Sequence, residues 1–371
     1  MKKQIFILVV LVLATFANVN KSFGQILTGA LSCPTPRTIT CLTADAMHPV
    51  AGTAYTYEVT VPLPLTGTKT FKWIVTQEQT FITNGTLNIT AAEIVGGQHI
   101  FAAGNELNAV SADPAGKDIS ITWKAFVPDP SLPVFVVIYV ENAITCTTQN
   151  LKVYKIEPVN AFTLDIANVD VSGTVANWNV DGASCFAPIA SAIYSSGPDG
   201  ITYDYGKNYI YYTVTAANFN TSWRPVFQLS GLNAAQTSSI DWSYSNAPTV
   251  WNAMTGAGNG SYTTAGQVDA KAVGGSVGSN GECIIIRVTI LNQKFEGLAV
   301  EPITLAVDGK TDLTQIPAKQ TPDVHHAGAV GVCGLSDGFA NDFATHNLQP
   351  RTTITDATSD VPNPTNYLPS K

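Results

Sequence analysis

The chain has 371 residues, of which 45% are hydrophobic and 12% are charged, and its formal net charge is −8. The hydrophobic share is large enough to build folded cores and excludes wholesale disorder, while the charged share is about half of that usual in a soluble protein. A negative chain without a long basic run disfavours nucleic acids and anionic membranes as partners.

Residues 1–24 are predicted to be a secretion signal. A positively charged start precedes an apolar stretch over residues 5–19, and the small residues Ser22 and Gly24 place cleavage before Gln25. The stretch is shorter than the roughly 20 residues of a bilayer-spanning helix. We therefore expect an exported protein without a membrane span after signal cleavage, located outside the cell, at its surface or in the periplasm.

Residues 25–49 predict an extended N-terminal segment, and residues 50–158 predict a first β-sandwich. Turn signals such as Asn84-Gly85 separate short runs with period-two alternation, which is typical of antiparallel sandwiches. The expected strands carry Tyr55, Tyr57, Val59 and Val61, then Phe71, Trp73 and Val75, then Ile119, Ile121, Trp123 and Ala125, followed by the apolar runs at residues 134–140 and 151–156.

Residues 159–310 predict a second β-sandwich. Its expected strands carry Ile210, Tyr212 and Val214, then Ile240, Trp242 and Tyr244, then Ile284, Ile286, Val288 and Ile290, with Ile303, Leu305 and Val307 in the last strand. The Gly-rich residues 256–281 favour a long hairpin loop. Residues 311–371 are rich in Pro, Thr, Asp and Asn and predict an extended or partly ordered tail with little core of its own, either free or packed along the second sandwich. The fold class is thus all-β, with tandem antiparallel β-sandwiches and extended ends.

Cysteine use indicates structural disulfides, as is usual in an exported chain. The six candidates are Cys33, Cys41, Cys146, Cys185, Cys283 and Cys333. Each half of the chain holds three, so complete pairing within one molecule needs at least one bridge between the halves; otherwise thiols stay free or pair between molecules. None forms Cys-x-x-Cys, which disfavours a redox or zinc role.

The order of motifs in residues 50–158 resembles a PKD-like (polycystic-kidney-disease-repeat-like), immunoglobulin-type module of secreted Bacteroidetes surface proteins. The matching stretches are residues 52–59, 71–73, 119–123, 136–146 and 153–158. The resemblance implies a sandwich of the kind found in gliding, adhesion and surface-filament proteins, many of them exported through type IX secretion. Residues 363–371 do not resemble the sorting domain of type IX substrates, so periplasmic residence and assembly into a larger structure both stay open.

Catalytic and metal-binding motifs are missing from the sequence. We find no Gly-x-Ser-x-Gly elbow, no Cys/His pair in a motif context and no recognisable carboxylate pair, and we predict a non-enzyme without cofactor or metal. The adjacent His325 and His326 point in different directions on a strand and make a poor metal site. Residues 337–342 offer oxygen ligands for calcium but lack the spacing of an EF-hand loop, and are interpreted as solvated turn residues.

Two of the six tryptophans carry the alternative functional interpretation. Trp223 and Trp251 lie in turn-rich contexts next to Arg or Asn, where they either pack locally or, if exposed, stack on sugars or anchor a subunit. We predict a non-catalytic structural or adhesive protein, a subunit of a cell-surface assembly or filament. It would self-associate or bind other surface proteins through poorly charged edge strands and its termini. The alternative is a carbohydrate-binding protein that holds glycans with Trp223 and Trp251.

Overall fold

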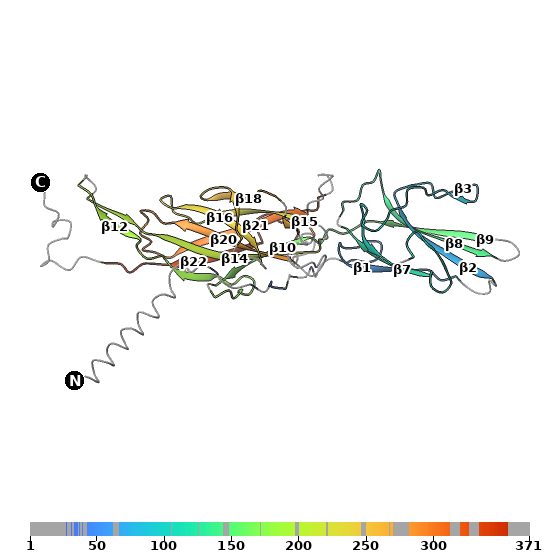
Figure 1. Cartoon of the computed structure of the whole chain (residues 1–371), viewed down its shortest axis with the longest axis horizontal. Helices are drawn as coiled ribbons and strands as arrows, with labels where there is room; N and C mark the ends of the chain where they lie inside the picture. The colour runs from blue at the N-terminus through green and yellow to red at the C-terminus, as the bar shows by residue number, and fades with distance from the viewer. Residues whose placement is uncertain are drawn as a thin grey trace, which may run out of the picture.

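The protein is all-β, and its strands form two tandem antiparallel sandwiches placed end to end (Figure 1). The computed structural model describes residues 27, 31, 33–35, 37, 39, 43–61, 67–104, 106–124, 126–143, 148–170, 172–196, 200–219, 222–245, 250–266, 268–269, 282–311, 320–325 and 334–354. The predicted signal at residues 1–24 lies outside these ranges. Within them, no helix is long and apolar enough to span a bilayer.

The first sandwich packs a three-stranded sheet against a four-stranded sheet. The three-stranded sheet has the order β1-β7-β5, with β1 at Ala54–Glu58, β7 at Asp118–Trp123 and β5 at Ile100–Ala103. The four-stranded sheet has the order β6-β2-β8-β9, with β6 at Val110–Ala112, β2 at Thr68–Thr76, β8 at Val134–Ala143 and β9 at Thr148–Ile156. A small hairpin joins β3 (Ile82–Thr83) to β4 (Thr86–Leu87).

The core of the first sandwich follows the predicted alternation. Trp73 from β2 and Trp123 from β7 are both fully buried, and Tyr57 from β1 lies between them in tilted and edge-on contacts. The indole nitrogens are satisfied, because Trp73 Nε1 donates to Gly116 O and Trp123 Nε1 donates to Tyr57 Oη. Period-two burial on both sheets confirms the predicted sandwich.

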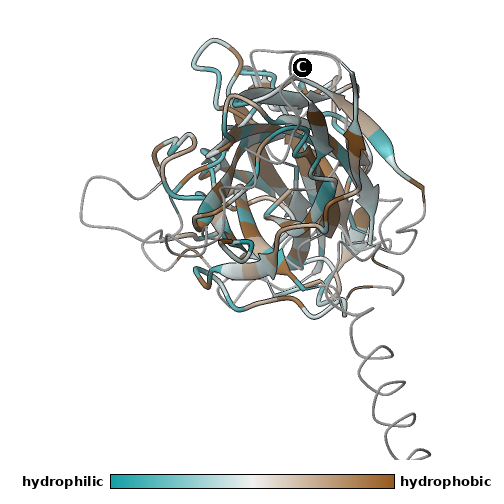
Figure 2. Ribbon diagram, turned by 90° about the vertical axis from the view of Figure 1, so that its left-hand side faces the viewer, coloured by the Kyte–Doolittle hydropathy of each residue, from teal (hydrophilic) through white to brown (hydrophobic). Residues whose placement is uncertain are grey.

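The second sandwich is larger. One sheet has the order β10-β14-β20-β16-β17 and the other has the order β18-β15-β21-β22-β11, and the pairing of β17 with β18 joins them. Viewed from the end farthest from the first sandwich, these strands surround the core, with hydrophobic segments recurring along them (Figure 2). The strands are β10 Thr163–Val169, β11 Gly182–Cys185, β14 Lys207–Ala217, β15 Ser222–Ser230, β16 Thr237–Tyr244, β17 Asn252–Thr255, β18 Gly260–Thr264, β19 Val268–Asp269, β20 Glu282–Leu291, β21 Glu301–Thr311 and β22 Phe343–Gln349.

The C-terminal region contributes a strand to this sandwich. β22 pairs antiparallel with β21 and parallel with β11, and its residues Ala344, His346 and Leu348 are buried. The prediction that residues 311–371 add little core is therefore wrong for β22, and β21 is not the last strand. The Gly-rich region is also partly strand, since it contains β18 and β19, while residues 270–281 lie outside the described ranges.

The N-terminal segment packs on the second sandwich, although the first sandwich follows it in the chain. Leu27 and Leu31 are buried in a small cluster with Tyr211 of β14 and Ile285 of β20. The chain then enters and leaves the first sandwich at neighbouring points, since Val159 N donates to the carbonyl oxygen of Pro49 at 2.9 Å. The first sandwich is thus inserted between two parts of the second.

Candidate functional site

The disulfide of the described chain joins Cys33 to Cys283, at a sequence separation of 250 residues. It fixes the N-terminal segment to β20 and links the two halves of the chain. The thiol of Cys185 is free and lies exposed on β11, so this structure contradicts the assignment of the residue as a disulfide candidate. Cys41, Cys146 and Cys333 lie outside the described residues.

The tryptophans expected to stack on glycans do not form an exposed pair. Trp223 is fully buried on β15, so the alternative prediction that it stacks on a sugar is wrong. The reason is alternation, because Trp223, Phe227 and Leu229 share the inward face of that strand. Trp251 is half-buried, and the guanidinium of Arg287 lies 4.3 Å from its ring centroid. One face of Trp251 is therefore covered, and Trp223, the partner that the alternative needs, is buried in the core.

The histidines of the C-terminal region are separated. His325 Nδ1 lies 4.0 Å from Asp337 Oδ2, and Asn341 Nδ2 lies 2.8 Å from the same ring nitrogen of His325. His346 is buried on β22, where its Nε2 lies 2.9 Å from Ser184 Oγ, and burial lowers its pKa to about 4. His326 lies outside the described residues. Carboxylate side chains, in contrast, do lie close together in this region.

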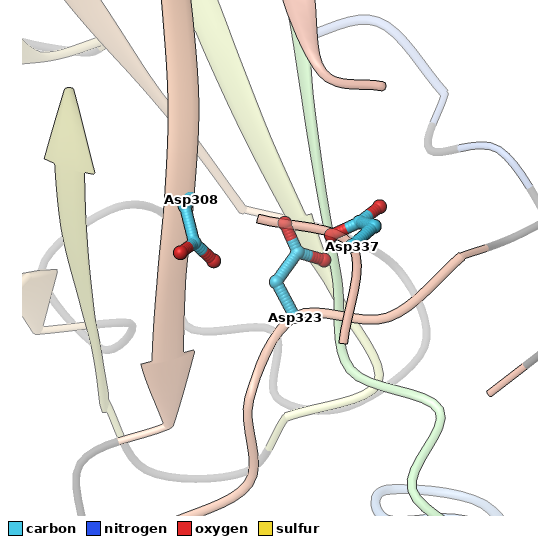
Figure 3. Close-up of side chains that lie close together, drawn as sticks. All are labelled: Asp308, Asp323 and Asp337. Carbon is cyan, nitrogen blue, oxygen red and sulfur yellow. The ribbon is translucent and has the colours of Figure 1, made fainter. Parts of the chain in front are cut away.

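Three carboxylates from separate segments meet in one cluster. Asp308 comes from β21, Asp323 from the stretch that crosses the end of β10, and Asp337 from the turn before β22 (Figure 3). One carboxylate oxygen of each lies within 4.8 Å of the others. Asp323 and the Asp337 side chain are both 0% exposed, whereas Asp308 is half-buried. Spacing of 15 and 14 residues matches no sequence motif, which is why the sequence did not predict the cluster.

The surroundings of the cluster raise the pKa of several of its carboxyl groups and so favour their neutral, protonated forms. Burial raises the pKa of Asp323 well above its usual value, and the nearby charges of Asp342 and Asp337 raise it further. Burial likewise raises the pKa of Asp342 to about 9, and the pKa of Asp308 is raised for the same reason. These carboxyl groups therefore favour their protonated forms, and they are all ionised at neutral pH only when a cation offsets their charge.

Arg37 supplies part of that compensation. Its Nε contacts Asp165 Oδ1 on β10, and its Nη2 lies 3.0 Å from Asp342 Oδ1. The backbone N–H of Arg37 also donates to Asp165 Oδ2 at 3.1 Å. Arg37 thus neutralises the outer carboxylates and fixes the N-terminal segment beside β10.

A separate feature, the tip hairpin, is formed by β12 (Ser191–Tyr194) and β13 (Ile201–Asp204). It lies at the end of the second sandwich farthest from the first (Figure 1). The two strands pair only with each other among the described residues. Large apolar side chains on both strands are exposed: Ile193 63%, Tyr194 67%, Ile201 40% and Tyr203 40%.

The first sandwich contains a cavity of about 420 Å³ between residues 59–61 and the strands β8 and β9. Its walls are apolar side chains together with Thr, Asn, Gln and the single lysine Lys152. No carboxylate, histidine or cysteine lines it in the described part of the chain. The described lining residues therefore offer no acid–base or nucleophile pair for catalysis.

Comparisons with known proteins show limited likeness. No protein-family model matches the chain, and no curated protein matches it. The N-terminal domain of PorA has a TM-score of 0.20 and 11% identity, over 50% of this chain and 96% of that one. The C-terminal domain of the antigen I/II-family protein AspA of Streptococcus pyogenes has a TM-score of 0.21 and 9% identity, over 75% of this chain and 84% of that one. The pilus protein RrgB of Streptococcus pneumoniae has a TM-score of 0.26 and 10% identity, over 69% of this chain and 44% of that one. TM-scores this low carry no argument about function.

Proposed function

We propose that this chain is an exported, non-catalytic structural or adhesive protein that joins a cell-surface assembly by self-association. The single observation that carries the proposal is the tip hairpin, β12 and β13, whose apolar side chains are exposed at one end of the molecule. Exposed apolar side chains gathered on one element are typical of protein contact sites.

The backbone of the tip hairpin is a second possible means of contact with another chain. Its two outer edges are unpaired among the described residues, and unpaired edges recruit strands from other chains unless charge, proline or a bulge protects them. Asp204 is the one charged residue within the two strands, and neither strand contains a proline. The tip hairpin therefore lacks the usual protection against pairing with a second copy.

The base of the hairpin is held in place. Tyr205 N donates to Gln293 O at 2.8 Å, and Asn292 N donates to Gly206 O at 2.9 Å, which ties the hairpin to the end of β20. Arg351 follows β22 and donates from Nη2 to the carbonyl oxygens of Ala187 and Tyr205, both at 2.7 Å. A fixed base lowers the entropy lost when the tip binds a partner.

The carbohydrate-binding alternative is not proposed, because its two stacking residues are unavailable together. Trp223 lies in the core and Arg287 covers one face of Trp251. The exposed Tyr203 of the hairpin stacks on the buried Tyr205, with ring centroids 5.7 Å apart. A protein partner can pack against this apolar surface, whereas a glycan needs an aromatic ring with an open face.

The test compares the wild-type chain with Ile193→Asp at the tip and Ile94→Asp as a matched control. Ile94 is also highly exposed but lies in the first sandwich, so both changes should leave folding within about 0.5 kcal/mol. We expect light scattering to show concentration-dependent assembly for the wild type and the control, and a monomer for Ile193→Asp, with unchanged circular dichroism. A wild type that stays monomeric, or equal assembly by all three, would refute the proposal.

A further inference from the structure

We propose that Asp308, Asp323 and Asp337 form a calcium site that fastens the C-terminal region to the second sandwich. This inference goes beyond the proposed function and does not depend on it. The site would take a hard divalent cation through carboxylate oxygens, with backbone carbonyls and water completing the coordination.

The first argument is an unsatisfied buried carboxylate. Asp323 is 0% exposed, and its Oδ1 accepts a hydrogen bond from Leu164 N at 2.8 Å. Its Oδ2 is buried and has no hydrogen-bond partner, and the same holds for both carboxylate oxygens of Asp337. Figure 3 shows these two carboxylates turned towards each other, with Asp308 beside them. Buried polar atoms without a protein partner usually mark a missing water or ion.

The second argument is charge balance. Arg37 contacts Asp165 and Asp342, so its single charge is already shared between two carboxylates. Among the described residues, the one basic group with a recorded contact to the three-carboxylate cluster is His325, at 4.0 Å from Asp337 Oδ2. When all three carboxylates are ionised, as cation binding requires, they carry three negative charges, and even a protonated His325 leaves two of these uncompensated. A divalent cation would offset this excess.

The third argument is the geometry of the donors. Calcium binds oxygen at about 2.3–2.6 Å, so two ligand atoms on opposite sides of one ion lie roughly 4.6–5.2 Å apart. The three carboxylate oxygens lie within 4.8 Å of one another and therefore fit around a single ion. The absence of Cys and His from this donor group disfavours zinc and favours a hard, oxygen-binding cation.

The ion would hold together segments that meet near the junction of the two sandwiches. Asp323 N donates to Gly309 O at 2.9 Å, and Val324 N donates to Phe162 O at 3.1 Å. Asn160 Nδ2 donates to Pro322 O at 2.8 Å. The stretch that carries Asp323 thus lies between β21 and the chain that enters β10. Calcium at this point would stabilise the second sandwich and the link that leads into it.

The experiment titrates calcium chloride into chelator-treated full-length protein and follows thermal unfolding by calorimetry. Extracellular modules bind calcium with dissociation constants of about 10⁻⁴–10⁻³ M, so a hundredfold excess over the dissociation constant corresponds to roughly 10–100 mM calcium. At a hundredfold excess over the dissociation constant, the transition of the second sandwich should rise by roughly 5–10 °C. The transition of the first sandwich should not move.

Asp323→Asn is the decisive variant because it keeps the shape of the side chain and removes its charge. We expect it to be at least as stable as the wild type without calcium, since it relieves repulsion, and to lose the calcium-dependent rise. Asp118→Asn, an exposed carboxylate on β7, is the matched control and should keep the full rise.

Calorimetric titration should give one calcium per chain for the wild type and for Asp118→Asn, and none at this site for Asp323→Asn. The inference is overturned if calcium does not shift the wild type, if Asp323→Asn shifts equally, or if zinc binds and calcium does not. Unfolding of Asp323→Asn in chelator would also count against it, because loss of a repulsive charge should not unfold the sandwich.

Discussion

Removal of the Cys33–Cys283 disulfide should destabilise the second sandwich and leave the first one intact. The bridge ties the N-terminal segment to β20, where Cys283 is fully buried. Leu27 and Leu31 of the same segment cover the outer face of β14 and β20. The double variant Cys33→Ala/Cys283→Ala therefore releases the segment that covers Tyr211 and Ile285 from its covalent link to β20. It also raises the conformational entropy of the unfolded chain.

The size of the effect follows from the loop that the bridge closes in the unfolded state. The hydrogen bond between Val159 and Pro49 holds the ends of the first sandwich together. When the second sandwich alone unfolds, the first acts as a short link, and the effective loop has roughly 140 residues. A loop of this length corresponds to about 5 kcal/mol of chain entropy at 25 °C. Because measured values usually fall below this limit, we expect a loss of about 3–5 kcal/mol.

Calorimetry under non-reducing conditions measures this loss as a fall of about 6–20 °C in the transition of the second sandwich. Cys185→Ala serves as the control, since its free, exposed thiol should contribute less than about 0.5 kcal/mol. A loss below about 1 kcal/mol in the double variant, or an equal loss in the control, would refute the reasoning from loop closure.

The remaining predictions concern one core aromatic and one buried histidine. Trp123→Ala should destabilise the first sandwich by about 3–5 kcal/mol, and an unchanged urea midpoint would contradict its place in the core. Burial lowers the pKa of His346 to about 4, below its unfolded value of 6.5, so its stabilising effect is complete above pH 6.5 and is lost as the pH falls towards 4. Unfolding free energies of the wild type and His346→Gln should diverge by up to about 3 kcal/mol across this window, and parallel curves would contradict the assignment.

The sequence predicts best those strands whose inward faces carry large apolar residues. The alternation of Ile284, Ile286, Val288 and Ile290 placed β20 correctly because period two is unambiguous with such side chains. β10 and β22 were missed for a different reason. Both mix polar residues into buried positions, such as Asp165 in β10 and His346 in β22. Tertiary contacts reach these groups: Arg37 donates to Asp165, and Ser184 lies beside Nε2 of His346. No local pattern reports such partners.

The site residues show the same limit. Trp223 carries a detectable signal, since it alternates with Phe227 and Leu229, but Pro225 within the run favours a turn or an edge strand. The carboxylate cluster has only a partial local signal, in residues 337–342. Their interpretation as solvated turn residues is wrong for Asp337 and Asp342, whose side chains are buried. Asp308 and Asp323 join Asp337 only after β21 and β22 have paired. The pairing of strands in the sheet brings these aspartates together, and their spacing in the sequence does not reveal it.

Both ends of the described chain are needed to complete the second sandwich, and this connects its stability to the proposed contact site. Arg37 from the N-terminal segment contacts Asp165 on β10 and Asp342 beside β22, so it joins the two sheets. Arg351, just after β22, clamps the base of the tip hairpin. Docking of the strand near the C-terminal end therefore adds the Arg351 contacts to the backbone hydrogen bonds that tie the hairpin to the end of β20.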